Sequence, residues 1–297
     1  MLRTKLLTLS AVTAAAALSL TACAPSSSQG GGGDAAGSSS AGESTSSGSG
    51  ESLRIGIKFD QPGLGYREGS AQPTGFDTDV ARYVADKLGV AEQDIEWVQT
   101  PSANRENALE NGEVDMIFAT YSITDARKER VDFAGPYFVA GQDLLVRADD
   151  TAITGPESLE GKNLCSVTGS TSAQKIKDQF ASGVNLVEQG GYAECVTYLE
   201  SGQVDAVTTD DIILAGLAAA DANKGKFKVV GNTFTTERYG VGLPKDSERC
   251  EDINEAIKEM KDSGEWKKAL ESNTEGTGYT YDETLNSGED AEFEPCA

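Results

Sequence analysis

The residue types best suited to chemistry gather behind one short apolar stretch, residues 114–119. Its pattern predicts a buried strand that runs directly into the hydroxyl side chains of Thr120 and Ser122. Thr124 can cap a following helix, which would carry Arg127 in its first turn. Hydroxyls, free N–H groups and an arginine fork are together suited to binding a carboxylate. The alternative is an arginine that is simply solvated.

A second stretch repeats this arrangement. Residues 199–205 match residues 109–115, with a helix end, glycine, valine and aspartate in the same order. An apolar strand follows each copy, and the second strand ends in two threonines and Asp210. The 90-residue separation exceeds a solenoid repeat, so the echo predicts two similar α/β lobes. A helix cap is the competing interpretation of Asp210, and Asp211 is the neighbour that could take its place.

A third candidate is the turn 168–172, where glycine and hydroxyl residues stand between an expected strand and an expected helix. Such a turn directs backbone N–H groups outward at a helix N-terminus, which favours an anion. An ordinary capped helix explains the same residues.

The elements that position these residues follow from alternating strand and helix patterns, beginning at Leu53. Before Asn111, a short helix is expected to bury Ala108 and Leu109 and to expose Glu106. Strands are expected at 53–57, 95–98, 114–119, 143–147, 164–167, 204–207, 227–230 and 238–243, and helices at 173–180, 192–199, 211–220 and 251–261. The tail 275–297 looks irregular.

These elements predict an α/β fold of two lobes. The first lobe would contain residues 53–147 plus 237–297, and the second lobe residues 148–236. Two strands would cross between the lobes and form a double-stranded hinge.

Composition excludes several classes of protein. The 297 residues carry a net charge of -23, which argues against binding nucleic acid because the phosphates would be repelled. The chain has no histidine, so the commonest general base and the commonest metal ligand are both missing. We therefore expect no metal, no cofactor and no catalytic residue.

The first 22 residues have the pattern of a secretory signal, with Arg3 and Lys5 ahead of an apolar core at 6–20. Residues 20–23 then resemble a bacterial lipobox, in which Cys23 is lipidated and becomes the new N-terminus. A plain cleaved signal with an incidental cysteine is the alternative. Residues 24–52 contain 19 Ser or Gly among 29 residues, which predicts a disordered tether from the lipid anchor.

Four further cysteines lie in the folded part: Cys165, Cys195, Cys250 and Cys296. An even number in an exported chain suggests disulfides, with three possible pairings. The lobe boundaries favour Cys165–Cys195 and Cys250–Cys296, because a bond across the lobes would lock the hinge. Zinc bound by four cysteines is the alternative, but no CxxC pair is present.

Over residues 53–275 the chain resembles the solute-binding proteins of polar amino-acid ABC importers, the bacterial extracellular solute-binding family 3. The likeness rests on the segments GFDTDVARYVADKLG, VDMIFATYSITDARKERVDFAGPYF, VTGSTS, VDAVTTD and YGVGLPKD. The second segment carries the family pattern T-x-x-R followed by D-F-S-x-P-Y, with Ala134 replacing the usual serine. GIKFDQPGLG is most similar to actinobacterial glutamate-binding lipoproteins.

The resemblance implies a periplasmic-binding-protein-like fold and a site for an amino-acid head group. Arg127 would pair with the α-carboxylate, which the backbone N–H of Thr171 would also reach. Asp210 would bind the α-ammonium group, helped by Ser122 and the carbonyl of Thr120. Opposite lobes would supply the two charges, and closure would bury them together.

Specificity is expected to come from the same lobe as Arg127. Acidic amino-acid binders in the family carry an Asn-Arg pair where this chain has Asn104 and Arg105, and Arg105 would bind a side-chain carboxylate. Ser102 stands where many relatives carry an aromatic clamp. Lys58 is a further candidate cation, although a strand-end lysine in water explains it equally well. Ligand methylene groups would be covered by Phe59 and Tyr66.

The resulting hypothesis is a monomeric, lipid-anchored receptor outside the cytoplasm that delivers an acidic amino acid, with glutamate foremost, to ABC permease subunits. Two alternatives remain. A sensor for a membrane signalling protein would use the same pocket, and a dehydratase-type enzyme exists on the same fold. An enzyme is disfavoured because no nucleophile–base pair is evident.

Overall fold

The computed structural model describes residues 52–180 and 183–296, which belong to one compact unit. The predicted signal, lipidated Cys23 and tether therefore lie outside the described residues, except for Ser52. Within that described part, no helix is both long enough and apolar enough to cross a bilayer.

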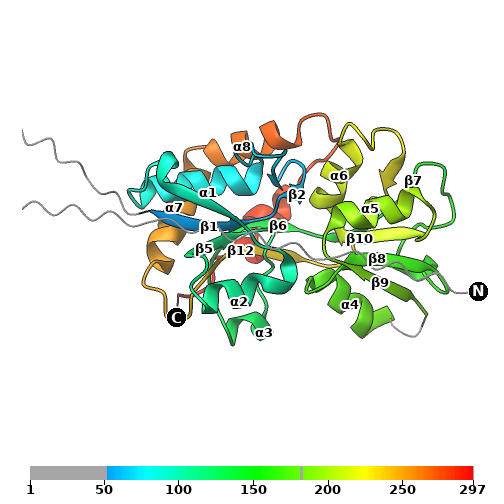
Figure 1. The fold of residues 1–297 in the computed structure, drawn as a ribbon, viewed down its shortest axis with the longest axis horizontal. Helices are drawn as coiled ribbons and strands as arrows, with labels where there is room; N and C mark the ends of the chain where they lie inside the picture. The colour runs from blue at the N-terminus through cyan, green and yellow to red at the C-terminus, as the bar shows by residue number, and fades with distance from the viewer. Residues whose placement is uncertain (1–51, 181–182, 297) are drawn as a thin grey trace, which may run out of the picture. The chain divides into compact units, whose positions relative to one another are not determined.

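The first sheet has the strand order β4-β1-β5-β12-β6 (Figure 1). Its strands are β1 (Leu53–Ile57), β4 (Ile95–Gln99), β5 (Met116–Phe118), β6 (Asp132–Ala140) and β12 (Glu237–Leu243). β1 pairs in parallel with β4 and β5, whereas β12 runs antiparallel to β5 and β6. The helices that accompany it are α1 (Phe76–Lys87), α2 (Arg105–Glu110), α3 (Asp125–Lys128), α7 (Cys250–Asp262) and α8 (Glu265–Thr274).

The second sheet has the order β11-β7-β10-β8-β9. Its strands are β7 (Gln142–Arg147), β8 (Asn163–Val167), β9 (Asn185–Gln189), β10 (Ala206–Asp210) and β11 (Phe227–Val229). α5 (Tyr192–Glu200) and α6 (Asp211–Ala219) lie on one side of it and α4 (Thr171–Phe180) on the other (Figure 1). β8 is parallel to β9 and β10, and β7 is antiparallel to β10 and β11. Each sheet therefore contains both parallel and antiparallel pairs, whereas alternation of strands and helices along a sequence predicts a mostly parallel sheet.

Two passages of the chain join the sheets. The first lies at Gly141, between β6 of the first sheet and β7 of the second, and the second lies between β11 and β12. The sequence analysis assigned 143–147 to the first lobe, but this strand pairs with β10 and β11 in the second sheet. By sheet membership the boundary therefore falls at Gly141. The apolar pattern of 143–147 could not reveal this, because a buried strand reads the same in either sheet.

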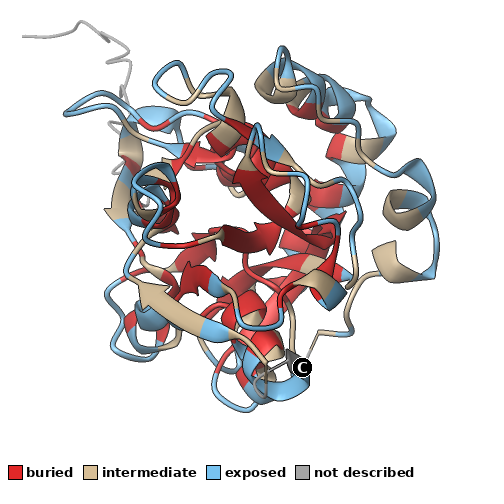
Figure 2. Cartoon of the chain, turned by 90° about the vertical axis from the view of Figure 1, so that its right-hand side faces the viewer, coloured by how far each residue is buried: buried red, intermediate tan, exposed pale blue. Residues whose placement is uncertain are grey.

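The core consists of the strands and the apolar faces of the helices, and the strands in the interior are the buried elements of Figure 2. A cluster of aromatic rings joins α1, β6 and α8, with Phe76 packed edge-on against Phe138 and Trp266. α1 begins after Gly75, whose φ of 122° brings it against the backbone of Leu64. An added Cβ there would lie 2.1 Å from the Leu64 carbonyl oxygen, so glycine is required at this contact.

The remaining elements are short. β2 (Asp60–Gln61) and β3 (Gly65–Tyr66) form a small hairpin after β1, and 3₁₀ turns occur at Glu92–Asp94, Ser102–Asn104, Pro156–Ser158 and Glu289–Ala291. The tail expected to be irregular contains α9 (Glu283–Ser287). Asp282 caps this helix by accepting hydrogen bonds from the backbone N–H groups of Thr284 and Leu285.

Both expected disulfides are present. Cys165–Cys195 joins β8 to α5, and Cys250–Cys296 joins the start of α7 to the C-terminal tail. Each bond closes within the elements of one sheet and its helices, which leaves the two passages between the sheets uncrosslinked.

Candidate functional site

Arg127 lies at the boundary between the two sheets. It belongs to α3, where the Thr124 hydroxyl accepts a hydrogen bond from its backbone N–H at 3.3 Å, the cap expected from the sequence. Its side chain turns inward, and the residue is 9% exposed. The guanidinium donates to the carbonyl of Ser122 at 2.7 Å and to that of Gly169 at 3.0 Å. Gly169 follows β8, so one arginine side chain holds residues of both sheets together.

Glu106 corrects the sequence analysis, which expected this side chain in water. Its side chain is only 13% exposed, and its carboxylate lies 3.2 Å from Nε of Arg127 and accepts a 2.7 Å hydrogen bond from Tyr121. Burial opposes its ionisation, but the Tyr121 hydrogen bond and the nearby Arg105 and Arg127 outweigh burial and lower the pKa of Glu106. A six-residue helix gives too few turns to define its buried face from periodicity.

Arg105 is more deeply buried, with 2% exposure. One terminal nitrogen donates to the carbonyl of Ala119 at 3.0 Å, and the guanidinium lies 4.1 Å from the ring centroid of Tyr121. Burial and the charge of Arg127 lower the pKa of Arg105 to about 10, which still leaves the side chain charged at neutral pH. Its Nε has no hydrogen-bond partner in the described part of the chain.

The backbone at Thr120 is held in an uncommon conformation, with a φ of 44°. Its N–H donates to the carboxylate of Asp77 at 2.9 Å, and the other Asp77 oxygen accepts from Tyr137 at 2.8 Å. Burial raises the pKa of Asp77 to about 6 even though both hydrogen bonds favour the ionised form. Asp77 therefore positions the strand end that leads to Ser122, a role that sequence reasoning missed although GFDTDV was among the matched segments.

Asp210 ends β10 and is 3% exposed. One of its carboxylate oxygens accepts a 2.5 Å hydrogen bond from Tyr239, and the other has no partner among the described residues. Its side chain makes no capping hydrogen bond to α6, so the helix-cap interpretation is not supported. Burial, together with the charge of Glu237, raises the pKa of Asp210 well above its usual value. A cationic group against the open oxygen would relieve this cost.

Thr171 connects the second sheet to β12. Its hydroxyl lies 3.3 Å from that of Ser122 and donates to Glu237 at 3.0 Å. Glu237 is 2% exposed and also pairs with Lys175 at 2.5 Å. The sequence offered no sign of this buried acid, because it stands at the first position of a strand beside an exposed loop.

The other predicted residues divide into two groups. Lys58 is buried, and its ammonium nitrogen lies 5.9 Å from the ring centroid of Tyr192. Because Lys58 is only 2% exposed, the solvated strand-end interpretation is wrong, and burial lowers the pKa of its ammonium group to about 8. Phe59 instead packs against the guanidinium of Arg67, and Tyr66 is 37% exposed. These last two residues line a surface cavity beside α5, and Phe59 also lines a second cavity together with Lys58.

Tyr192 is a buried residue that the sequence analysis treated only as the start of a helix. Burial and the charge of Asp210 raise the pKa of its hydroxyl to about 12, and Arg105 also lies within electrostatic range. The ring thus lies among the cations of the first sheet and the acid of the second.

Two cavities are each lined by residues of both lobes. One, of about 340 Å³, is lined by Lys58, Phe59 and Pro101 together with Gly191 and Glu194. The other, of about 350 Å³, is lined by Arg127 and Thr124 together with Thr171 and Lys175. The contact between Arg127 and Gly169 borders the second cavity.

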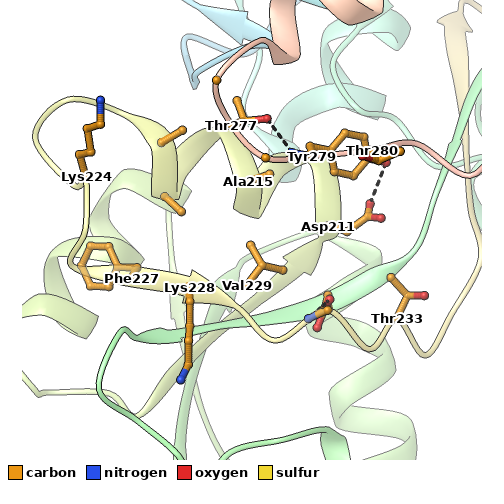
Figure 3. A pocket seen from close by; sticks show the side chains of 16 residues that line it. Asp211, Ala215, Lys224, Phe227, Lys228, Val229, Thr233, Thr277, Tyr279 and Thr280 are labelled. Atoms are coloured by element: carbon orange, nitrogen blue, oxygen red, sulfur yellow. Dashed lines mark hydrogen bonds between the residues drawn. The ribbon is translucent and has the colours of Figure 1, made fainter.

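A larger cavity of about 550 Å³ lies elsewhere, between α6, β11 and residues 276–280 (Figure 3). Asp211 faces it, with the Tyr279 hydroxyl 3.5 Å away. Its carboxylate accepts from the backbone N–H groups of Ile212 and Gly141. Asp211 is thus committed to local hydrogen bonds, whereas Asp210 keeps one carboxylate oxygen without a partner among the described residues. The described residues contain no cluster of three or more potential metal ligands.

The model of the bacterial extracellular solute-binding proteins, family 3, matches residues 53–274. The chain belongs to this family. Glutamate-binding protein GluB of Corynebacterium efficiens is 48% identical over 233 residues, which cover 75% of this chain and 78% of that protein. A glutamine-binding protein of Geobacillus stearothermophilus is 39% identical over 196 residues, covering 66% of this chain and 73% of the relative.

A solved structure supports the same assignment. An ancestral arginine-binding protein bound to glutamine has a TM-score of 0.69 and 36% identity, covering 74% of this chain and 96% of that chain. The comparison confirms the predicted two-lobed α/β fold of the solute-binding family. The family consists of extracellular proteins, so the matched part of this chain works outside the cytoplasm. The relatives named here are binding proteins.

Proposed function

We propose that this solute-binding protein captures an acidic amino acid, with glutamate as the principal ligand, and delivers it to an ABC permease. The observation that carries the proposal is that two buried charged side chains, one from each lobe, both keep an atom without a hydrogen-bond partner. Arg105 leaves its Nε without a partner, and Asp210 leaves one carboxylate oxygen without a partner, among the described residues. Buried polar atoms of this kind cost free energy until a ligand satisfies them.

The amino-acid head group accounts for one set of contacts. Arg127 binds the α-carboxylate, because Glu106 and the Ser122 carbonyl hold its guanidinium in place beside the N-terminus of α4. The backbone N–H of Thr171 adds a second donor at that helix end. Asp210 takes the α-ammonium group, with Ser122 and the carbonyl of Thr120 nearby.

The ligand side chain accounts for the second set. Arg105 binds a side-chain carboxylate, and Lys58 adds a second cation from the end of β1. Both cations are buried, and the ammonium nitrogen of Lys58 lies 5.9 Å from the ring centroid of Tyr192. A ligand with a second negative charge offsets their desolvation, whereas an amide ligand does not. The glutamate-binding relative supports this preference, and the glutamine-binding relative identifies the competitor to test.

Calorimetry of the purified chain with each of the twenty amino acids tests the proposal. Glutamate should bind most tightly, with aspartate next and glutamine weaker. Asp210→Asn should abolish binding because the ammonium loses its anion, yet the empty variant should be no less stable, because a buried carboxylate has been neutralised. The exposed Asp149→Asn is the matched control for loss of one charge. If no amino acid binds the wild-type protein, the proposed function is wrong.

Delivery and anchoring need separate tests. We propose that Cys23 carries the lipid and that residues 24–52 tether a monomeric receptor to the outer face of the membrane. Cys23→Ala should release the protein from membranes without changing its affinity for glutamate. Deleting the protein should remove glutamate uptake, whereas intact uptake with a lost transcriptional or signalling response would favour the sensor. Recovery of unchanged glutamate after long incubation would count against a dehydratase.

A further inference from the structure

The two lobes meet directly at Gly169. This residue follows β8 in the second sheet, and its φ is +80°. Its carbonyl accepts the 3.0 Å hydrogen bond from Arg127. A Cβ added at Gly169 would lie 2.7 Å from Cα and 2.9 Å from N of Ala103, and 3.0 Å from the carbonyl carbon of Ser102. All three atoms are backbone, so no side-chain rotation could relieve the collision.

The surface against Gly169 is the turn Ser102–Asn104, which leads without a break into α2 and Arg105. On the other side, Ser170 and Thr171 follow Gly169, and Thr171 begins α4. Gly169 therefore lies at the contact between two turns. One turn leads to Arg105 and the other leads to Thr171. Moving either turn by the length of a methyl group would separate the hydroxyls of Ser122 and Thr171 and break the bond from Arg127 to Gly169.

We propose that Gly169 is a positioning residue for ligand capture: its lack of a side chain is what allows the second lobe to close on the first. The inference rests on the proposed function, because closure matters only if a ligand is held between the lobes. It adds a residue that contacts no ligand through a side chain yet limits affinity. A variant with any side chain here would fold and remain open.

The chain supplies a matched control for the backbone strain of such a variant. Gly202, also within the second lobe, has a φ of +75°, and nothing lies within 4 Å of the Cβ position. Alanine is strained at both glycines to a similar degree, since both have positive φ. Only at Gly169 does the added carbon meet the other lobe. Asparagine, which tolerates positive φ, removes most of the strain while keeping the Cβ.

The test compares Gly169→Ala and Gly169→Asn with Gly202→Ala and Gly202→Asn in the full chain. Calorimetry gives the glutamate affinity, small-angle scattering gives the radius of gyration with and without glutamate, and thermal melting of the empty protein reports folding. Both Gly169 variants should bind glutamate at least tenfold more weakly than the Gly202 variants and should lose the ligand-induced decrease in radius. Their melting temperatures without ligand should match those of the Gly202 variants.

Two contrary results are distinguishable. If the wild type and the Gly202 variants bind and compact, and the Gly169 variants do the same, the closure role of Gly169 is wrong while the proposed function stands. If the wild-type protein binds none of the twenty amino acids, the proposed function fails and this inference fails with it.

Discussion

At the scale of single residues, Arg105 and Arg127 differ in what holds them. Arg127 already contacts one carboxylate and two carbonyls, which fix its orientation, whereas Arg105 donates to the carbonyl of Ala119 and leaves its Nε without a partner in the described part of the chain. The first arrangement suits a group common to every ligand, and the second suits a group that only some ligands possess.

Truncating these arginines should therefore give different profiles. Arg127→Ala should abolish binding of every amino acid, because the common carboxylate loses its fork. Arg105→Ala should weaken glutamate by about 2–5 kcal/mol, or roughly 30- to 5,000-fold, and glutamine by much less. Calorimetry with both ligands measures the difference, and Arg130→Ala, which removes an arginine paired with Glu110 at the surface, is the control. Equal losses for glutamate and glutamine in Arg105→Ala would contradict the specificity assignment and turn attention to Lys58.

Asp77 predicts a pH dependence of stability. Its pKa is raised from 3.8 to about 6, so the folded state binds a proton more tightly than the unfolded chain. The contribution of Asp77 to the free energy of unfolding is therefore highest below its pKa in the unfolded chain, 3.8. This contribution falls as pH rises to about 6 and stays constant at higher pH. The change corresponds to about 3 kcal/mol for a fully buried group.

Asp77→Asn should remove this change. Relative to the wild type, the variant should gain stability as pH rises from 4 to 7, measured by urea unfolding at several pH values. Asp149→Asn again controls for the loss of one charge. A constant difference between wild type and Asp77→Asn across this range would show that the carboxyl does not titrate as described.

At the scale of elements, the disulfide Cys165–Cys195 joins β8, which precedes the Gly169 turn, to α5, which carries Tyr192. The bond closes a segment with a sequence separation of 30, for which loop-closure entropy gives about 3–4 kcal/mol. The double variant Cys165→Ala, Cys195→Ala should lose about this much stability, with a further loss from the small cavity. Denaturant unfolding of the variant and of the reduced wild type measures it; reduction without loss would oppose this view.

The same elements show where sequence reasoning succeeds. The strands and most helices follow from apolar runs bounded by Gly and Pro, and the disulfide pairing follows from the lobe division. Arg127 and Asp210 stand at strand and helix ends, where polar residues have few reasons to be buried. Their types and positions left a solvated arginine and a helix-capping aspartate as alternatives, the family resemblance favoured ligand contacts, and the structure buries both side chains.

What the sequence could not give depends on contacts between distant segments. Glu106 is buried because Tyr121 and Arg127 contact it. Asp77 acts on the strand end because the backbone N–H of Thr120 donates a hydrogen bond to its carboxylate. Phe59 and Tyr66 have the apolar character of ligand-covering residues, but only Phe59 lines the cavity that Lys58 borders, whereas Tyr66 lies in the hairpin after β1 and is 37% exposed. No periodicity encodes such placements.

At the scale of the whole molecule, two passages between sheets and uncrosslinked lobes predict a closing motion on ligand binding. Small-angle scattering should show a smaller radius of gyration with glutamate than without it. Mass action should also raise the free energy of unfolding by about 2.7 kcal/mol at a hundredfold excess over Kd. The free amino acid glycine, which lacks a side-chain carboxylate, is the control ligand. An unchanged radius at saturating glutamate would contradict the hinge.

The uneven division of charge between the lobes has a kinetic consequence. Lys58, Arg105 and Arg127 all come from the first lobe, while Asp210 comes from the second. Under the proposed function, a dicarboxylate would dock on the first lobe while the molecule is open, and that lobe would set the association rate. Escape would require the second lobe to release both the ammonium group at Asp210 and the Arg127–Gly169 bond, so the second lobe would set the residence time. A permease that pulled on the second lobe alone could therefore empty the receptor without disturbing the surface that loads it.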